Sequence, residues 1–439
     1  MAVFFGTDGI RGVVNDFLTH NLAFKCGNSL AYDKESPTII IGCDTRPTAS
    51  FLISAFAGGA MSAGANVIDI GVCPTAGIAY ITRELNADYG VVISASHNPS
   101  EYNGIKIFDD KGFKLGDKNE EALERRFVNE KNVDYLNVGK YIQRRSLTKK
   151  YENYLVSCCK ADLSGLKIVL DCSNGASCKI APRVFKRLGA KVISTHARVV
   201  GNKINYKCGS TYPETLCRAV KRYKADVGFA FDGDADRIVA CDEKGNIIDG
   251  DNILFMLAKY LKTKNELKND TVVGTSHTNI GIEKELNNYN INLIRTDIGD
   301  KYVISKIEES GLSLGGEKSG HVIIRQFSTT GDGILTGVKI AEMLKALDKK
   351  PSMLVCKMLY PQINIDCVVY DKLKVINSEK VNKEIKIQQA KLGKDARIMV
   401  RCSGTESKIR IMVECKNKSL AEHSAKYIEE VVYEVDKLT

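Results

Sequence analysis

Three carboxylates stand at alternate positions in the stretch DGDADR, which follows the apolar run VGFAF. They belong to Asp232, Asp234 and Asp236. Carboxylates at this spacing repel one another unless a cation neutralises them. The small residues between them let the backbone turn so that all three oxygens face one point, and hard oxygen ligands of this kind suit Mg²⁺. The stretch therefore predicts a magnesium site.

A calcium-binding EF-hand loop is the nearest alternative for this stretch. Asp232, Asp234, Asp236 and Glu243 would occupy ligand positions one, three, five and twelve of such a loop. However, Arg237 stands where an EF-hand requires glycine, and the flanking runs are typical of strands. This excludes an EF-hand, and a solvated acidic loop without metal remains the alternative.

A serine and a histidine, Ser96 and His97, lie in the sequence SASHNP after the apolar run YGVVI. The hydrolase motif G-x-S-x-G is absent, and a serine that only caps a turn is the simpler interpretation. Two neighbours favour a functional role. Lys106 in NGIK places a cation near this loop, and the carboxylate stretch ends the corresponding strand of the next module.

The sequence GGEKSGH contains Glu317, Ser319 and His321. It imitates a nucleotide-binding P-loop, but Glu317 interrupts the required G-K-[ST] ending. The three side chains could instead present donors and acceptors to sugar hydroxyls, and a glycine-rich turn without a ligand is the alternative.

Two further stretches favour anions. Between Arg401 and Arg410, the sequence RCSGTESKIR combines backbone N–H groups around Gly404 with the hydroxyls of Ser403 and Thr405. Hydroxyls, arginines and consecutive backbone N–H groups are typical of a phosphate-binding nest. Near the N-terminus, GTDGIRG holds Arg11 in a turn bracketed by glycines.

Repeated elements must position these loops. Three times, a buried strand, an amphipathic stretch and a second strand precede a third strand that ends in a polar loop. The first strands are TIIIGC, LKIVLD and TVVGT, and the third strands lead into SASHNP, DGDADR and GGEKSGH. We interpret this as an internal repeat of one α/β unit. Ligands bind at the carboxyl ends of strands in open α/β sheets, so each module is predicted to contribute a loop to a shared central cleft.

The expected fold class is therefore α/β, with three similar mixed-sheet domains and a smaller α+β C-terminal domain around the cleft. We place the serine loop in residues 1–148, the carboxylate loop in 149–248, the GGEKSGH loop in 249–360 and the phosphate loop in 361–439. The last part should contain a strand, a Lys-rich helix, a strand–loop–strand and an amphipathic helix from Leu420 to Leu438.

Composition limits the function classes. At 439 residues the chain is too long for one core, and its net charge of +10 fits an anionic partner, either nucleic acid or a phosphorylated small molecule. Basic residues are not interleaved with stacking aromatics, so a nucleic-acid-binding protein is the weaker alternative. Fourteen cysteines without a C-x-x-C pair predict reduced thiols in a cytoplasmic protein, and no signal peptide or membrane span is expected.

Together, the serine, carboxylate, GGEKSGH and phosphate stretches resemble the α-D-phosphohexomutase superfamily in content and order, from Gly6 to Glu414. FGTDGIRG and TTGDG are most similar to its bacterial phosphoglucosamine mutase branch. The resemblance implies an isomerase that interconverts glucosamine 6-phosphate and glucosamine 1-phosphate through a phosphoserine and a hexose 1,6-bisphosphate, for the UDP-N-acetylglucosamine precursor pathway. A phosphomannomutase or phosphoglucomutase with the same mechanism remains the alternative.

The resemblance also implies roles for individual residues. Ser96 would carry the phosphoryl group and bind one Mg²⁺ together with Asp232, Asp234 and Asp236. Glu317 and Ser319 would bind the sugar hydroxyls. The catalytic residues near the reacting oxygens would be Arg11, Lys106, His97, His321 and Arg237. The phosphate that does not react would be bound by Arg401, Ser403, Gly404, Thr405 and Arg410.

Two departures concern the choice of sugar. Lys318 stands where the glucosamine branch usually has Gln, and Ala235 stands where that branch more often has Gly. The resemblance implies a small-molecule sugar phosphate as substrate, with neither a nucleic acid nor a membrane as partner, and it leaves a homodimer open.

Overall fold

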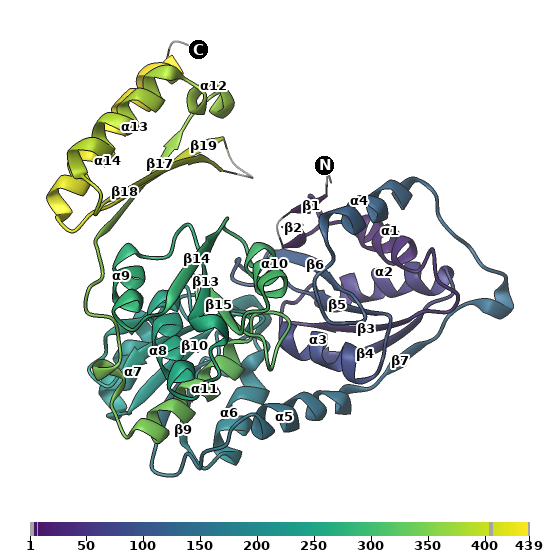
Figure 1. Cartoon of the computed structure of the whole chain (residues 1–439). Coiled ribbons are helices and arrows are strands. Elements are labelled where there is room, and N and C mark those ends of the chain that lie inside the picture. Colours follow the sequence, from purple (N-terminus) through teal and green to yellow (C-terminus); the bar gives the residue numbers. More distant parts are fainter. Residues whose placement is uncertain (1–3, 7, 404–406, 438–439) are drawn as a thin grey trace. The chain divides into compact units, whose positions relative to one another are not determined.

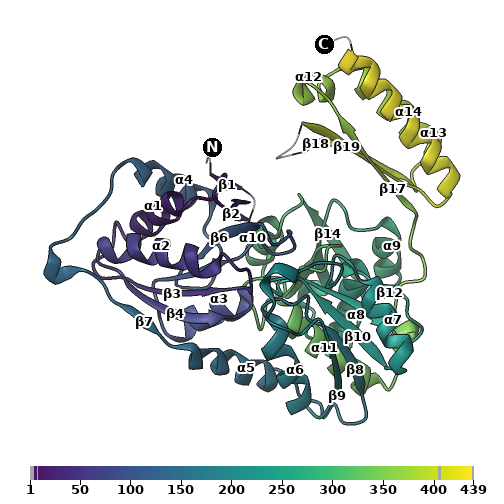
Figure 2. The same ribbon diagram turned by 180° about the vertical axis from the view of Figure 1, so that it is seen from behind.

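The computed structural model describes residues 4–6, 8–403 and 407–437, and the chain divides into two compact units (Figures 1 and 2). One unit extends to His277 and resumes over 291–355. The other combines Thr278–Asn290 with the chain from Cys356 onward.

The first module is built on a seven-stranded mixed sheet with the order β1-β2-β6-β5-β3-β4-β7. Its interior strand β3 is apolar and buried from Ile39 to Cys43, as expected for a strand covered on both faces. Helices α1 and α2 lie on one side of this sheet and α5 on the other (Figures 1 and 2). The strands are β1 (Phe5–Gly6), β2 (Gly9–Val13), β3 (Thr38–Cys43), β4 (Asn66–Val72), β5 (Tyr89–Ile93), β6 (Tyr102–Phe108) and β7 (Tyr141–Gln143), and the helices are α1 (His20–Leu30), α2 (Ala49–Ser62), α3 (Thr75–Glu84), α4 (Asp117–Arg125) and α5 (Thr148–Ser157).

The second and third modules have smaller sheets, ordered β12-β11-β10-β8-β9 and β14-β13-β15-β16. The second contains β8 (Lys167–Asp171), α6 (Ser177–Arg187), β9 (Lys191–Thr195), α7 (Glu214–Tyr223), β10 (Val227–Phe231), β11 (Ile238–Asp242) and β12 (Ile247–Ile248). From there the chain continues through α8 (Gly250–Thr263), β13 (Thr271–Thr275), α9 (Ile280–Asn288), β14 (Asn292–Thr296), α10 (Asp300–Ser310), β15 (Leu314–Gly316), β16 (Val322–Ile324) and α11 (Gly333–Leu347).

The sheet order confirms the internal repeat. In each module the first strand lies between the second and the third and is parallel to both, and a fourth strand is antiparallel to the third. The resulting orders are β4-β3-β5-β6, β9-β8-β10-β11 and β14-β13-β15-β16. The third strand occupies the same position in each sheet. The polar loop that follows it therefore begins at the same edge of the sheet in every module.

The C-terminal unit has an antiparallel sheet with the order β17-β19-β18. The predicted Lys-rich helix is divided into two, because Ser378 adopts an extended conformation between them. Asn279 ties α9 to this unit by bonding both backbone groups of Tyr360, over 2.8 and 3.0 Å. The elements are β17 (Gln362–Val368), α12 (Lys372–Ile376), α13 (Glu379–Leu392), β18 (Arg397–Cys402), β19 (Lys408–Glu414) and α14 (Lys418–Lys437).

Short 3₁₀ turns connect several of these elements: Arg126–Val128, Tyr135–Asn137, Arg145–Leu147, Gly201–Lys203, Lys268–Asp270 and Pro351–Met353. Side-chain caps set the starts of two long helices, since Asp249 accepts from Asn252 N at α8 and Asp332 accepts from Leu335 N at α11. All fourteen cysteines are free in the structure. Among the described residues, no helix combines the length and hydropathy needed to cross a bilayer.

Candidate active site

The loop after β5 holds Ser96 in an unusual conformation. Ser96 is fully buried, and its φ of 51° lies in the left-handed region, which a non-glycine residue adopts only when its surroundings hold it there. Its N–H donates to Ser94 Oγ over 2.9 Å. Its carbonyl oxygen accepts from Arg46 Nη2 over 2.9 Å and from Asn205 Nδ2 over 2.8 Å. So oriented, Ser96 Oγ donates to Asp232 Oδ2 over 2.6 Å.

No motif pointed to Arg46, yet this residue organises the serine loop. Its guanidinium is buried and pairs with Asp44 over 2.9 Å. The same guanidinium donates to the carbonyl oxygens of Ser96, Asn98, Pro99 and Tyr102. The only sequence signal is the polar ending CDTR of the first buried strand. Arg46 is thus a positioning residue for the candidate nucleophile.

The three predicted metal ligands converge in the loop between β10 and β11. Asp232, Asp234 and Asp236 are each at most 2% exposed, and one oxygen from each lies within 4.8 Å of the other two. Burial, together with repulsion by Asp236 and Asp234, raises the pKa of Asp232 well above its usual value. The Oδ1 atoms of Asp234 and Asp236 accept no hydrogen bond from the part of the chain that the structure describes. Crowded carboxylates with unsatisfied buried oxygens can bind a metal ion.

Lys106 reaches this group from β6 and is 1% exposed. Its Nζ lies 3.0 Å from Asp8 Oδ2, 2.8 Å from Asp234 Oδ2 and 3.2 Å from Asp236 Oδ2. Burial alone would lower the pKa of Lys106, but the carboxylates raise it well above its usual value. The ammonium group is therefore a fixed positive charge, which favours charge neutralisation over proton transfer as its contribution.

Burial and the neighbouring Arg237 together determine the protonation state of His97. Arg237 Nη1 donates to His97 Nδ1 over 3.0 Å, so this ring nitrogen acts as an acceptor. Ser96 Oγ lies 3.4 Å from the same nitrogen. Burial, with the charges of Arg237 and Arg11, lowers the pKa of His97 to about 4. With its Nδ1 lone pair already engaged, His97 is placed to orient Arg237.

We expect His97 in the metal-free, unphosphorylated chain to stay neutral until the pH approaches about 4. An unfolded histidine ionises near pH 6.5, so this folded-state depression adds stability that is complete above about pH 6.5 and is lost as the pH falls toward 4. Urea unfolding across this range should show a shallower loss of free energy for His97→Gln. Equal slopes for the variant and the wild-type chain would contradict the expectation.

Gly233 allows the serine loop and the carboxylate loop to lie close to each other. A Cβ on Gly233 would lie 2.5 Å from the carbonyl oxygen of Ser96. The loop before α6 is equally close on the other side, because a Cβ on Gly175 would lie 2.3 Å from the carbonyl oxygen of Gly233. Ala235 in the same loop has a φ of 59°, a conformation that suits glycine. The spacing of the aspartates thus depends on their small neighbours.

For Gly233→Ala we expect kcat/KM to fall by about 10²-fold, because the added methyl group must push Ser96 away from the carboxylates and misplacement near 1 Å costs about this much. Steady-state turnover would measure it. Gly116→Ala is the matched control, since its Cβ would meet nothing within 4 Å. Equal rates for both variants would show that the close approach is not needed.

His321 and Arg11 complete the cluster. His321 forms an isolated bridge with Arg237, its Nε2 accepts from Gly331 N over 2.9 Å, and its Nδ1 lies 3.8 Å from Asp236 Oδ2. Arg11 donates to Asn98 Oδ1 over 3.3 Å. The three modules therefore bring together every predicted catalytic and metal-binding residue.

A chain of charges beside this cluster was not predicted from the sequence. Lys114 bonds both Asp8 and Asp300, Asp8 also pairs with Arg11, and Asp300 Oδ2 lies 3.5 Å from His321 Nε2. Burial raises the pKa of Asp8, but Lys106, Lys114 and Arg11 together hold it well below its usual value. Because the partners come from distant segments, no local pattern could have revealed them.

The two predicted sugar-binding residues, Glu317 and Ser319, differ in how far they are buried. Glu317 is partly buried, and its Oε1 accepts from Gly299 N over 3.0 Å. Ser319 is exposed. Their contact with a sugar stays a prediction.

The predicted phosphate residues lie in the C-terminal unit. Arg401 on β18 is directly opposite Arg410 on β19. Burial, with repulsion by Arg410, lowers the pKa of Arg401. Two facing guanidinium groups are typical of an anion site. Ser403 is buried at the end of β18, whereas Gly404 and Thr405 lie outside the described residues.

A cavity of about 880 Å³ lies elsewhere in the larger unit. It is bordered by α2, β4 and β7 and by residues of α5 and α6. None of the predicted site residues lines it, so it is distinct from the candidate active site.

Four family models match the chain in sequence order. Three describe the α/β/α domains I, II and III of phosphoglucomutase/phosphomannomutase and match residues 2–134, 148–245 and 249–360. The fourth describes the C-terminal domain and matches 364–431. These matches agree with three α/β domains and a smaller C-terminal one.

Curated relatives match over nearly their whole length. A phosphoglucosamine mutase of Caldanaerobacter subterraneus subsp. tengcongensis is 45% identical, over 98% of this chain and 99% of its own. One of Carboxydothermus hydrogenoformans is 43% identical over 100% of both chains. A solved phosphoglucomutase/phosphomannomutase family protein from Burkholderia thailandensis has the same fold, with a TM-score of 0.83 at 23% identity over 99% of this chain and 98% of that one. So does an Aspergillus fumigatus N-acetylphosphoglucosamine mutase in complex with GlcNAc-6P and magnesium, with a TM-score of 0.71 at 17% identity over 99% and 96%.

Proposed function

Because the chain belongs to the phosphoglucomutase/phosphomannomutase family, we propose that it is the isomerase that interconverts glucosamine 6-phosphate and glucosamine 1-phosphate. The choice of sugar rests on the phosphoglucosamine mutases that are 41–45% identical to it over the full chain. The chemistry rests on one observation, the buried Ser96 hydroxyl that is 2.6 Å from a carboxylate of the aspartate cluster. This reaction would supply an amino-sugar precursor for UDP-N-acetylglucosamine.

The aspartate loop fits a hard divalent cation. Its donors are carboxylates only, and two of their buried oxygens accept no hydrogen bond from described residues. Asp232, Asp234 and Asp236 would hold Mg²⁺ together with a phosphate oxygen on Ser96. Bound there, the ion would neutralise charge on the phosphoryl group.

The chain's own residues would do the remaining work. Phosphoryl transfer depends mainly on positioning and on neutralising charge. We propose that Ser96 carries the phosphoryl group and gives it to the free hydroxyl of the sugar phosphate. The P–Oγ bond breaks, a new P–O bond to the sugar forms, and the hydroxyl proton finally replaces phosphorus on Oγ. Lys106, Arg11 and Arg237 supply fixed positive charge, and His321, whose Nε2 accepts from Gly331 N, adds a polar Nδ1–H group 3.8 Å from Asp236.

The product of this transfer would be a hexose 1,6-bisphosphate, which returns its other phosphate to Ser96. We propose that Glu317 and Ser319 bind the sugar hydroxyls, and that the phosphate not in reaction is bound by Arg401, Ser403, Gly404, Thr405 and Arg410. A trace of hexose 1,6-bisphosphate would then activate the unphosphorylated chain, because it can phosphorylate Ser96 directly.

Turnover of glucosamine, glucose and mannose 6-phosphates, with Mg²⁺ and a trace of hexose 1,6-bisphosphate, tests the proposed function. We expect kcat/KM to be highest for the amino sugar. Glucose or mannose phosphate in the lead would assign the chain to the alternative activity with the same mechanism. Turnover of none of the three would reject the proposal.

Lys318 offers a second test of the sugar. A cation near the ammonium group of the substrate would be unfavourable. If Lys318 faces the sugar, Lys318→Gln should raise the preference for glucosamine phosphate over glucose phosphate. An unchanged ratio would mean that Lys318 points away from it.

We further propose that the enzyme acts in the cytoplasm on free sugar phosphates, without a nucleic acid or a membrane as partner.

A further inference from the structure

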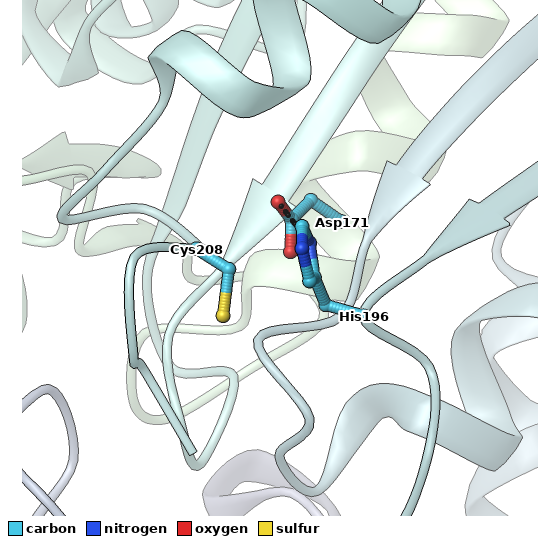
Figure 3. A group of neighbouring side chains, drawn as sticks. All are labelled: Asp171, His196 and Cys208. Carbon is cyan, nitrogen blue, oxygen red and sulfur yellow. Dashed lines mark hydrogen bonds and ion pairs between the residues drawn. The ribbon is translucent and has the colours of Figure 1, made fainter. Parts of the chain in front are cut away.

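A second group of metal-binding side chain types lies in the second module, outside the candidate active site (Figure 3). Asp171 ends β8, His196 follows β9, and Cys208 lies in the loop that leads to α7. Strands β8 and β9 are parallel neighbours, and Asp171 is paired with Thr195, so their carboxyl ends place Asp171 beside His196. One donor atom from each of the three side chains lies within 4.8 Å of the other two.

Asp171 is completely buried and held in place. Its Oδ1 accepts from Ser173 N over 3.0 Å, and its Oδ2 accepts from Thr215 Oγ1 over 3.1 Å. The same Oδ2 lies 2.9 Å from His196 Nδ1. Bonds of this kind fix the orientation of a carboxylate ligand before the metal arrives. The His196 side chain is 35% exposed, which leaves a path from solvent.

Cys208 supplies the independent observation. Its thiol is 0% exposed and makes no hydrogen bond to any described residue, although neighbouring Cys178 contacts three carbonyl oxygens. In Figure 3 the cysteine side chain extends beside the Asp171–His196 pair. Cys208 thus has a buried sulfur without a hydrogen-bond partner in the described chain, and it lies next to a carboxylate and an imidazole. These three side chains form a donor set with no other assigned use.

We propose that Asp171, His196 and Cys208 bind one Zn²⁺ ion, with water as a fourth ligand. The set of one sulfur, one nitrogen and one oxygen suits zinc, whereas Mg²⁺ prefers oxygen ligands alone. The thiolate and the carboxylate carry two negative charges that balance the ion. On binding, the thiol proton leaves to solvent and the remaining imidazole proton resides on Nε2. Tetrahedral bonds would set the donors about 3.3–3.6 Å apart, which small side-chain rotations can reach.

This site would act by stabilising structure. The segment between His196 and Cys208 contains Asn205, whose Nδ2 donates to the carbonyl oxygens of Ser96 and Asn98 over 2.8 and 3.1 Å. A metal bound at both ends of this segment would hold Asn205 against the serine loop. The ion would therefore support the loop without touching the substrate.

Cobalt(II) gives a test that the aspartate loop cannot imitate, because only a thiolate ligand produces a sulfur-to-cobalt charge-transfer absorption. The full chain, stripped with a chelator and then given excess Mg²⁺ to fill the aspartate loop, should show this absorption on addition of Co²⁺ and saturate at one equivalent. Zn²⁺ should then displace the cobalt and abolish the absorption. With the aspartate loop already saturated by excess Mg²⁺, Zn²⁺ should further raise the thermal midpoint of the wild-type chain.

The variants decide the assignment. Cys208→Ser should lose the absorption and the zinc-dependent thermal shift, and His196→Asn should weaken Co²⁺ binding at least tenfold. Cys217→Ser is the matched control and should keep both. Circular dichroism would show whether Cys208→Ser folds. If it does not fold, the result for His196→Asn decides the test. The absence of the absorption, or an absorption that persists in Cys208→Ser or disappears in Cys178→Ser, would overturn the proposal. None of these readouts depends on turnover, so they are independent of the proposed function.

Discussion

Ser96→Ala should reduce turnover at least about 10⁴-fold, because Ser96 would carry the phosphoryl group and loss of a covalent nucleophile costs several orders of magnitude. The side chain is buried and donates its hydroxyl to Asp232, so its removal leaves the aspartate cluster without this donor. A hydrogen bond of this kind contributes about 1 kcal/mol, so the fold should persist. Steady-state kinetics would measure the first effect, and thermal unfolding the second.

Labelled hexose 1,6-bisphosphate makes this test specific. The wild-type chain should take up one phosphoryl group, found on Ser96 by peptide mass spectrometry, and Ser96→Ala should take up none. Ser100→Ala is the matched control, because Ser100 lies four residues further along the same loop and only partly buried. Label on the Ser96→Ala variant, or full turnover without the hydroxyl, would remove Ser96 from the mechanism.

Asp234→Asn should lower turnover by at least about 10³-fold and remove its dependence on Mg²⁺, because one charged donor of the cation site is lost. The structure makes asparagine a better replacement than alanine. Asp234 Oδ2 accepts from Thr75 Oγ1 over 2.7 Å and from Lys106 Nζ over 2.8 Å, and an amide oxygen can keep both bonds. Lys106 also retains Asp8 and Asp236. The free energy of unfolding without metal should therefore change by only about 1 kcal/mol.

Unfolding in the presence of Mg²⁺ separates a metal site from a structural carboxylate. An ion at 100 times its Kd stabilises the folded state by about 2.7 kcal/mol, so Mg²⁺ should stabilise the wild-type chain and not Asp234→Asn. Asp16→Asn removes the same charge at an exposed position and should behave as wild type. A large loss of stability in metal-free Asp234→Asn would instead show that the carboxylate serves the fold.

Much of the candidate site could be predicted from the sequence because its information is local. A buried strand and the polar loop after it form one continuous stretch of sequence. Comparison of the three repeats showed that Ser96, Asp232 and Glu317 follow corresponding strands. Since parallel strands direct their carboxyl ends to one edge of a sheet, each module's loop could be placed at the edge of its own sheet where ligands bind. The α/β class, the C-terminal antiparallel sheet and the absence of disulfides among the cysteines followed from patterning and composition in the same way.

The tertiary structure decided how each of these residues behaves, because charge, burial and backbone conformation depend on partners far away in the chain. Ser96 and Asp232 are 136 positions apart, and their bond could not be predicted from either loop. Lys106 became a fixed cation only because three carboxylates surround it, and His97 became a neutral acceptor because it is buried and faces Arg237. The role of Arg46 could not be predicted because, apart from Asp44, its partners are backbone carbonyls, which have no signature in the sequence. The types of side chain at the site and the order of the loops along the chain could thus be predicted from local sequence. The protonation states of these side chains and the close approach of the loops were decided by tertiary packing.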